Sequence, residues 1–212
     1  MSLVDYELVG KQNLRNALVR REYNKILKEG MKELKEGSVI LLETSAENYF
    51  EANATSVKFL LDNGFEGVYM SFQRPFKNLS ALFAQQDIDM NKLLIIDGAT
   101  SFSGEVQEKN PRCIDISKDL DVSEIIQIIY TSLKKLESEK KFVFVDSLST
   151  MALYEPLSET ARFTETLIRT LKEKDFRKVT LFFNVAEDLA QKRYIENISI
   201  YADEFLHLGL CT

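Results

Sequence analysis

The stretch GSVILLETSAENYFEANATSVKFLLDNGFEGVYMSF, residues 37–72, decides the fold class. It begins with a continuous apolar run and passes through a short polar segment into an amphipathic one. A second apolar run follows a glycine. This order of strand, loop, helix and strand is the order in which a phosphate-binding α/β protein begins. The loop after the first strand, however, contains neither glycine nor lysine.

Apolar runs of similar length recur along the chain. Where a half-exposed strand would alternate, these runs are continuous, at residues 38–43, 67–72, 92–97, 141–146 and 179–184. Continuous runs indicate strands that are buried on both faces, as in a parallel sheet covered by helices. A final edge strand is predicted at residues 203–208.

Helical patterns fall between the runs. After the opening loop, apolar residues recur at spacings of four, three and four, at Phe50, Ala54, Val57 and Leu61. Asp121 and Glu124 have the spacing of a capping box and predict the start of another helix. Two more helices are predicted, at about residues 158–174 and 11–28. Alternating strands and helices predict a three-layer, doubly wound α/β fold with a mainly parallel sheet.

The composition favours a single globular domain. The chain has 212 residues, of which 45% are hydrophobic and 28% are charged. We expect a helical extension over residues 1–36 and one α/β domain over residues 37–212. Residues 1–36 carry eight Lys and Arg against six Asp and Glu, within a net charge of -6. This acidic balance argues against a dedicated nucleic-acid binder.

The sequence also indicates the compartment. There is no run of eighteen apolar residues, and Cys113 and Cys211 lie far apart without a metal-binding spacing. We therefore expect a cytoplasmic protein in a reducing environment, with no membrane contact.

Ligands of doubly wound sheets bind beyond the carboxyl ends of the strands, so the residues that follow the apolar runs are the candidate site. Besides the loop over residues 44–51, these residues are Gln73, Arg74, Asp97, Asp146, Ser147 and Asn184.

Over about residues 37–208 the chain resembles the RecA-like P-loop ATPases, and specifically their archaeal and bacterial KaiC-like branch. The similar stretches are GSVILLE, NGFEGVYMSFQRPFKNL, MNKLLIID, KFVFVDSLSTM and ISIYADEFLHL. The resemblance implies a RecA-like P-loop fold, in which related domains build rings or filaments with nucleotide between subunits.

The phosphate loop of that family is altered in this chain. Active members carry G-x-x-x-x-G-K-[ST], whose glycines let backbone N–H groups surround the phosphates and whose lysine reaches the terminal phosphates. The resemblance places Thr44 and Tyr49 at the glycine positions, Phe50 at the lysine position and Glu51 at the Ser/Thr position. The residues between are Ser45, Ala46, Glu47 and Asn48. Every defining residue is replaced.

The charge of the loop is reversed as well. Glu43, Glu47 and Glu51 are expected to surround the pocket where a triphosphate would sit. At about 4 Å, like charges repel by roughly 1 kcal/mol in water and about 4 kcal/mol at an effective dielectric constant of 20. Phosphate binding by this loop is therefore expected to be poor.

The same loop has a structural explanation. Asn48 and Glu51 have the spacing of a capping box, which would satisfy the helix N-terminus without a phosphate. Phe50 continues the apolar stripe and is expected to pack against the sheet. On this interpretation the phosphate site is filled by the protein itself.

The other family positions point the same way. Where KaiC-like proteins have acidic residues that activate water, this chain has Gln73 and Arg74, so no carboxylate remains to act as a base. Asp146 matches the Walker B aspartate, but a lone carboxylate makes a weak Mg²⁺ site. We expect it to hydrogen-bond to backbone or to Ser147. We therefore expect no catalytic residues, no metal, no cofactor and no ATPase activity.

Three further elements are open to interpretation. His207, the single histidine, is interpreted as a structural or surface residue. The mixed charges of the helix at 11–28 favour a docked or dimerising helix over a nucleic-acid contact. The connection over residues 98–112 is a place where a partner or substrate would touch.

Three hypotheses follow. The first, which we favour, is a pseudo-ATPase that binds a protein or peptide partner or associates with itself. The second is a non-hydrolysing binder of a nucleotide or small molecule that uses Arg74, Asp146 and residues 98–112. The third is a DNA-binding relative of the recombinases that uses the basic N-terminal helix; the acidic balance makes it the least favoured.

Overall fold

The computed structural model describes residues 3–32, 35–103, 110–117, 120–173, 176–186 and 192–209. These residues form one seven-stranded sheet with the order β4-β3-β2-β5-β6-β1-β7, in which every pairing is parallel. The strands are β1 (Val39–Thr44), β2 (Glu66–Ser71), β3 (Leu93–Asp97), β4 (Cys113–Asp115), β5 (Lys141–Asp146), β6 (Thr180–Ala186) and β7 (Glu204–Leu208).

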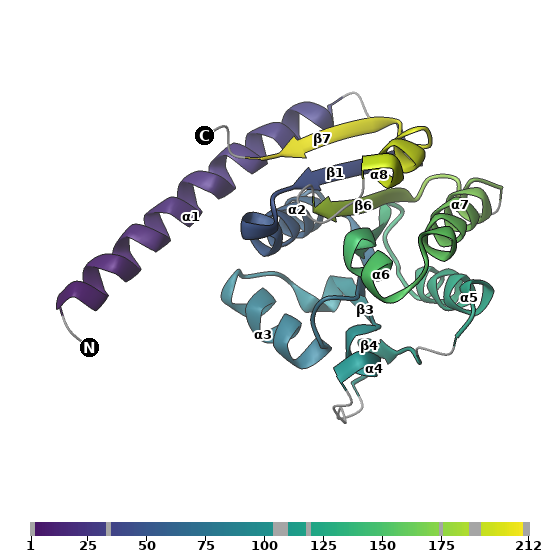
Figure 1. Cartoon of the computed structure of the whole chain (residues 1–212), viewed down its shortest axis with the longest axis horizontal. Coiled ribbons are helices and arrows are strands. Elements are labelled where there is room, and N and C mark those ends of the chain that lie inside the picture. The colour runs from purple at the N-terminus through teal and green to yellow at the C-terminus, as the bar shows by residue number, and fades with distance from the viewer. Residues whose placement is uncertain are drawn as a thin grey trace.

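Helices cover both faces of this sheet. They are α1 (Leu3–Gly30), α2 (Tyr49–Asp62), α3 (Phe76–Gln85), α4 (Ala99–Ser103), α5 (Val122–Leu133), α6 (Leu148–Tyr154), α7 (Leu157–Glu173) and α8 (Lys192–Ser199). In Figure 1, α1 and α3 lie on the opposite side of the sheet from α5 and α7. The predicted three-layer, doubly wound α/β fold is confirmed.

The core consists of two apolar clusters, one on each face of the sheet. Successive residues of β1 point to opposite faces, so Val39 and Leu41 join the cluster beneath α5 and α7, whereas Ile40 and Leu42 join the cluster beneath α1, α2 and α3. Burial on both faces explains why the strand sequences are continuously apolar.

The predicted strands agree with the observed ones to within two residues at each end. The predicted helices at 158–174 and after the opening loop are also present, and the helix predicted at 11–28 extends over Leu3–Gly30. Strand β4 and helices α3, α4, α6 and α8 were not predicted. Residues 98–112, predicted as an open connection, contain α4, and residues 104–109 lie outside the described part of the chain.

Gly37, which opens the deciding stretch, is required by both conformation and space. Its φ is 81°, and a Cβ atom at this position would lie 1.8 Å from the carbonyl oxygen of Arg177. Any side chain would therefore be strained and would collide with backbone before β1 begins.

Helix α1 leaves the body of the protein. The helix packs on α2 and on strand β7 of the sheet, and this contact buries Val19, Tyr23 and Leu27. The helix then continues beyond the sheet to its N-terminal end (Figure 1). Leu14 and Leu18 of α1 are 63% and 59% exposed. Among the described residues, no helix is long and apolar enough to cross a membrane.

Candidate functional site

The altered loop lies at the carboxyl end of β1, where the resemblance places it. Thr44 ends the strand, Ala46–Asn48 form a single 3-10 turn, and Tyr49 begins α2. The buried Thr44 hydroxyl donates to Asn184 Oδ1 at 3.2 Å. Asn184, at the carboxyl end of β6, in turn donates to Asn53 Oδ1 on α2. Protein side chains therefore hydrogen-bond to one another across the end of the strands.

Tyr49, which the sequence resemblance aligns with the second glycine of the phosphate-loop motif, is only 3% exposed. Its hydroxyl group lies against Asp146. Burial, and secondarily the charge and hydrogen bonding of Asp146, raise the pKa of Tyr49 well above its ordinary value. The first turn of α2 thus contains a neutral, buried phenol.

Asp146 is buried at the end of β5, with 1% of its surface exposed. The Tyr69 hydroxyl donates to its Oδ2 atom, whereas among the described residues no hydrogen-bond partner reaches Oδ1. Burial raises the pKa of Asp146; the neighbouring Tyr49 and Tyr69 hydroxyl groups and the charge of Arg74 oppose this effect without cancelling it. Asp146 therefore keeps its proton to a higher pH than an exposed aspartate.

The predicted partner of Asp146 was wrong in one respect. Ser147 does not bond to the carboxyl group; it caps α6, where its Oγ accepts from the Thr150 N–H at 3.0 Å and donates to Thr150 Oγ1 at 2.9 Å. The peptide bond between Asp146 and Ser147 is cis. The hydroxyl that bonds to Asp146 comes instead from Tyr69, in the middle of the neighbouring strand β2.

The three carboxylates do not gather around the loop as expected. Each one pairs with a basic side chain from outside the loop. Glu47 pairs with Arg15 at 2.8 Å and Glu51 with Arg20, both on α1, and Glu43 lies 3.1 Å from Nδ1 of His207 on β7. The expected repulsion is relieved by these partners.

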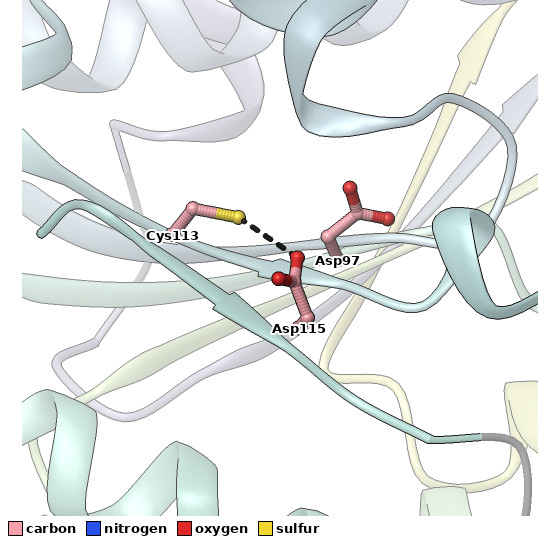
Figure 2. Close-up of side chains that lie close together, drawn as sticks. All are labelled: Asp97, Cys113 and Asp115. Carbon is pink, nitrogen blue, oxygen red and sulfur yellow. Dashed lines mark hydrogen bonds between the residues drawn. The ribbon is translucent and has the colours of Figure 1, made fainter. Parts of the chain in front are cut away.

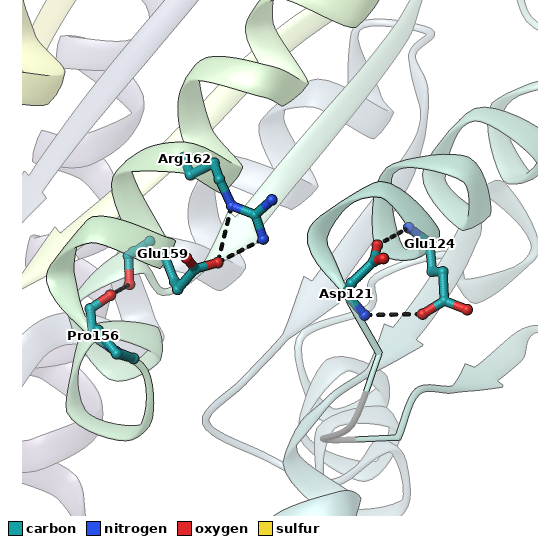
Figure 3. Close-up of polar contacts among 6 residues, drawn as sticks. Asp121, Glu124, Pro156, Glu159 and Arg162 are labelled. Carbon is teal, nitrogen blue, oxygen red and sulfur yellow. Dashed lines mark hydrogen bonds and ion pairs between the residues drawn. The ribbon is translucent and has the colours of Figure 1, made fainter.

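The predicted capping box at Asn48 is also wrong. Asn48 makes no side-chain cap of α2, and its amide group instead donates to Ser45 Oγ at 3.1 Å. Because Glu51 is held by Arg20, it does not return to the start of the helix. The capping box at Asp121 and Glu124 is confirmed: both of its hydrogen bonds measure 2.9 Å (Figure 3).

Phe50, which was predicted to pack against the sheet, is partly buried and packs on the apolar cluster beneath α1, α2 and α3. Its ring stacks on Phe83 with 6.2 Å between centroids. The guanidinium carbon of Arg74 lies 5.2 Å from the centroid of the Phe50 ring. Gln73 is exposed. Arg74 thus contacts the ring of Phe50, and its positive charge partly offsets the rise in the pKa of Asp146.

Asp97 is fully buried and has a structural position. Its carboxylate accepts from the Phe76 N–H at 2.6 Å, from the Thr100 N–H at 2.9 Å and from the Thr100 hydroxyl at 2.7 Å. These bonds fix the starts of α3 and α4. Strand β2 lies between β3 and β5, and its residue Ser71 pairs with Asp97 of β3 and with Asp146 of β5. One strand therefore separates the two aspartates.

Asp97 also lies near Cys113 and Asp115, and their potential ligand atoms are within 4.8 Å of one another. Figure 2 shows these side chains on two adjoining strands, β3 and β4. The Cys113 thiol donates to Asp115 Oδ1 at 3.5 Å. Burial and the two carboxylates raise the pKa of Cys113, which disfavours the thiolate a metal would need. The group is better explained as hydrogen-bonded structure.

The sequence did not reveal a cavity of about 230 Å³ at the carboxyl ends of β2, β3 and β5. Its walls are largely apolar, formed by Phe72, Ile116, Val122, Ile125 and Met151. Charged side chains stand at its rim, where Arg162 donates to Glu159 at 2.6 and 3.0 Å and Asp121 caps α5 (Figure 3). Only Gly98 and Ser101 of its lining fall within the connection singled out from the sequence.

No protein-family model matches the chain, and no curated protein matches it. Solved structures do match. The KaiC-like protein PH0186 from the hyperthermophilic archaeon Pyrococcus horikoshii is 17% identical, with a TM-score of 0.54 over 81% of this chain and 72% of that one. The chain therefore shares its fold with this KaiC-like protein.

Two other structures from the same organism are similar. The uncharacterized protein PH0321, solved in complex with an unknown peptide, is 16% identical, with a TM-score of 0.65 over 85% of this chain and 81% of that one. The structure of PH0250 is 12% identical, with a TM-score of 0.58 over 86% of this chain and 87% of that one. At these identities the likeness concerns the fold.

Proposed function

We propose that the protein is a pseudo-ATPase, which keeps the RecA-like fold, does not hydrolyse nucleotide and acts by binding a protein or peptide segment or by self-association. The observation that carries the proposal is Tyr49, whose buried side chain stands at the second glycine position of the phosphate loop and lies against Asp146.

The electrostatics of the loop support the loss of nucleotide binding. A phosphate-binding loop offers backbone N–H groups and a lysine to the phosphates. Here Phe50 stands at the lysine position and packs on Phe83. Asp146 is buried and one of its oxygens already accepts from Tyr69, and burial raises its pKa, so it is less suited to bind Mg²⁺ than an exposed, ionised carboxylate.

The fold likeness to PH0321, a structure that contains a peptide, supports a peptide or protein segment as the ligand class. A peptide needs no phosphate loop, so such a role is compatible with the filled site. Binding of a segment would use surface grooves of the scaffold rather than the end of β1.

A thermal-unfolding measurement with and without millimolar Mg-ATP tests the loss of nucleotide binding. Nucleotide at 100 times its dissociation constant would stabilise the fold by about 2.7 kcal/mol. We expect no change in melting temperature, and no phosphate release above buffer. A KaiC-like ATPase with an intact phosphate loop, measured in parallel, is the positive control. A rise of several degrees with Mg-ATP would refute the proposal.

One observation favours a second function, the binding of a small molecule. The cavity at the carboxyl ends of β2, β3 and β5 has apolar walls and a charged rim, which are common features of small-molecule sites. Calorimetric titration with a nucleotide and metabolite panel tests it. The variant Met151→Trp, which would fill the cavity, should abolish any binding, and Ile200→Trp, at an exposed position outside the cavity lining, should leave it unchanged. Binding that Met151→Trp retains would exclude this cavity.

A further inference from the structure

A groove of about 390 Å³ lies at the amino ends of the strands, the edge opposite the altered loop. It is formed where α1 and α2 end and where β1, β2, β5 and β6 begin. Its described lining residues are Lys28, Met31, Lys32, Lys35, Glu36, Phe59, Asn63, Phe65, Glu139, Lys140, Lys178 and Thr180.

The charge of this groove is opposite to that of the chain. Of its described lining residues, five are lysines and two are glutamates, whereas the whole chain has a net charge of -6. Lys178 pairs with Glu36 at 3.0 Å, but their side chains are 72% and 66% exposed, and such a pair is readily exchanged for another. The groove therefore presents a local positive field on an acidic protein.

The floor of the groove is apolar. Met31, Phe59 and Phe65 are partly buried and pack on the core beneath α1 and α2. Lys140 Nζ lies 5.6 Å from the centroid of the Phe65 ring. The lysine stems extend this apolar surface while their ammonium groups stay in water. An apolar side chain can thus be buried here between positive charges.

We propose that this groove binds an acidic peptide segment, in which an aromatic or aliphatic side chain is flanked by Asp or Glu. The inference rests on the proposed function and names its site and the chemistry of its partner. The apolar side chain would contact Met31, Phe59 and Phe65, and the carboxylates would pair with Lys28, Lys32 and Lys35.

The observations favour a peptide over a nucleic acid. The basic side chains are lysines, which act as point charges and lack the planar fork that arginine offers to phosphate. The rest of the chain carries a negative charge, which would repel a long polyphosphate backbone. A short segment whose charges lie beside one apolar anchor fits the charge pattern and the floor together.

Selection from a fully randomised peptide display library, with the full chain as bait, tests this inference. The selected peptides should be enriched in Asp and Glu around an apolar residue. The affinity of the most enriched synthetic peptide is then measured by fluorescence anisotropy. Lys32→Glu/Lys35→Glu should weaken it about tenfold or more, since two rim charges are reversed. The matched variant Arg21→Glu/Lys25→Glu, on the exposed part of α1, should leave it unchanged.

The outcomes separate the two proposals. Peptides that bind both charge-reversed variants as they bind the wild type would exclude this groove but leave a peptide-binding function standing. Failure to enrich any peptide would overturn the groove and the peptide ligand together, and the Mg-ATP result would still stand on its own. Enrichment of basic or neutral peptides, or displacement of the peptide by single-stranded oligo-dT through Lys32 and Lys35, would also refute the acidic-peptide site.

Discussion

Two helices of this protein begin with the same sequence pattern and different structures. At α5, Asp121 and Glu124 exchange both hydrogen bonds of a capping box. At α2, Asn48 and Glu51 have the same spacing but exchange neither, because Glu51 pairs with Arg20 of α1. The capping box therefore forms at α5, where its two residues have only local partners. It does not form at α2, where an arginine distant in sequence pairs with the glutamate.

The surroundings of the two helix starts explain the difference. Asp121 and Glu124 are exposed, so the backbone N–H groups are their strongest partners. The Glu51 side chain is only 12% exposed and lies beneath α1. There an arginine offers a charge-assisted bond, which is stronger than a bond to a neutral N–H. The start of α2 is held by tertiary contacts, and the start of α5 by its own cap.

The strongest test of this contrast is Tyr49→Ala. Because Tyr49 is buried at the first position of α2, removing its ring should cost about 3–5 kcal/mol of unfolding free energy. Urea unfolding measures this loss. Tyr49→Phe, which keeps the ring, should cost much less. If Tyr49→Ala loses less than about 1 kcal/mol, the ring does not hold the start of α2.

The variant Asp146→Asn should be more stable than the wild type at neutral pH, because it removes a buried carboxyl group whose ionisation is unfavourable. Burial raises the pKa of Asp146 in the folded state above the unfolded value, which is about 3.9. As the pH rises from the unfolded pKa to the folded one, the unfolded state loses its proton first, so the wild type loses stability. Asparagine keeps the shape without the charge.

The melting temperatures of Asp146→Asn and of the wild type should therefore be compared from pH 4 to pH 7. The advantage of the variant should grow with pH over this range and then level off above the folded pKa. An advantage that is constant with pH, or that shrinks as the pH rises, would show that Asp146 is ionised in the folded protein.

The capping contrast itself is tested by matched alanine substitutions. Asp121→Ala removes a bonded cap and should cost about 1 kcal/mol. Asn48→Ala removes a residue that makes no side-chain cap, so it should cost no more than about 0.5 kcal/mol. Equal losses in urea unfolding would contradict the difference between the two helix starts.

Much of the fold follows from the sequence for a physical reason. Strands buried on both faces must be apolar throughout, and this pattern identifies β1, β2, β3, β5 and β6 in the sequence. Strand β4 has three residues, Cys113–Asp115, and too short a run to be recognised. Positions at strand ends, such as Thr44, Asp146 and Asn184, were found because the topology brings them to one edge.

The partners of those positions were harder to find. Arg20 lies 31 residues from Glu51, and no periodicity connects them. Tyr69 had a signal that could have been used: a hydroxyl group inside a fully buried strand needs a hydrogen-bond partner. By that rule, the partner of Tyr69 is expected among the carboxyl groups at the ends of the neighbouring strands β3 and β5.

The smallest expected effect is that of the ion pair between Arg20 and Glu51, which forms in place of a capping box at α2. A double-mutant cycle of Arg20→Ala and Glu51→Gln should give a coupling energy of about 1 kcal/mol or less, falling as salt is added. The same cycle on Arg15 and Glu47, whose side chains are 46% and 66% exposed, should give a smaller coupling. In Arg20→Ala, Glu51 is released to bond to the start of α2, so part of the loss should be recovered. If the coupling of Arg20 with Glu51 is no larger than that of Arg15 with Glu47, burial of Glu51 does not strengthen the pair.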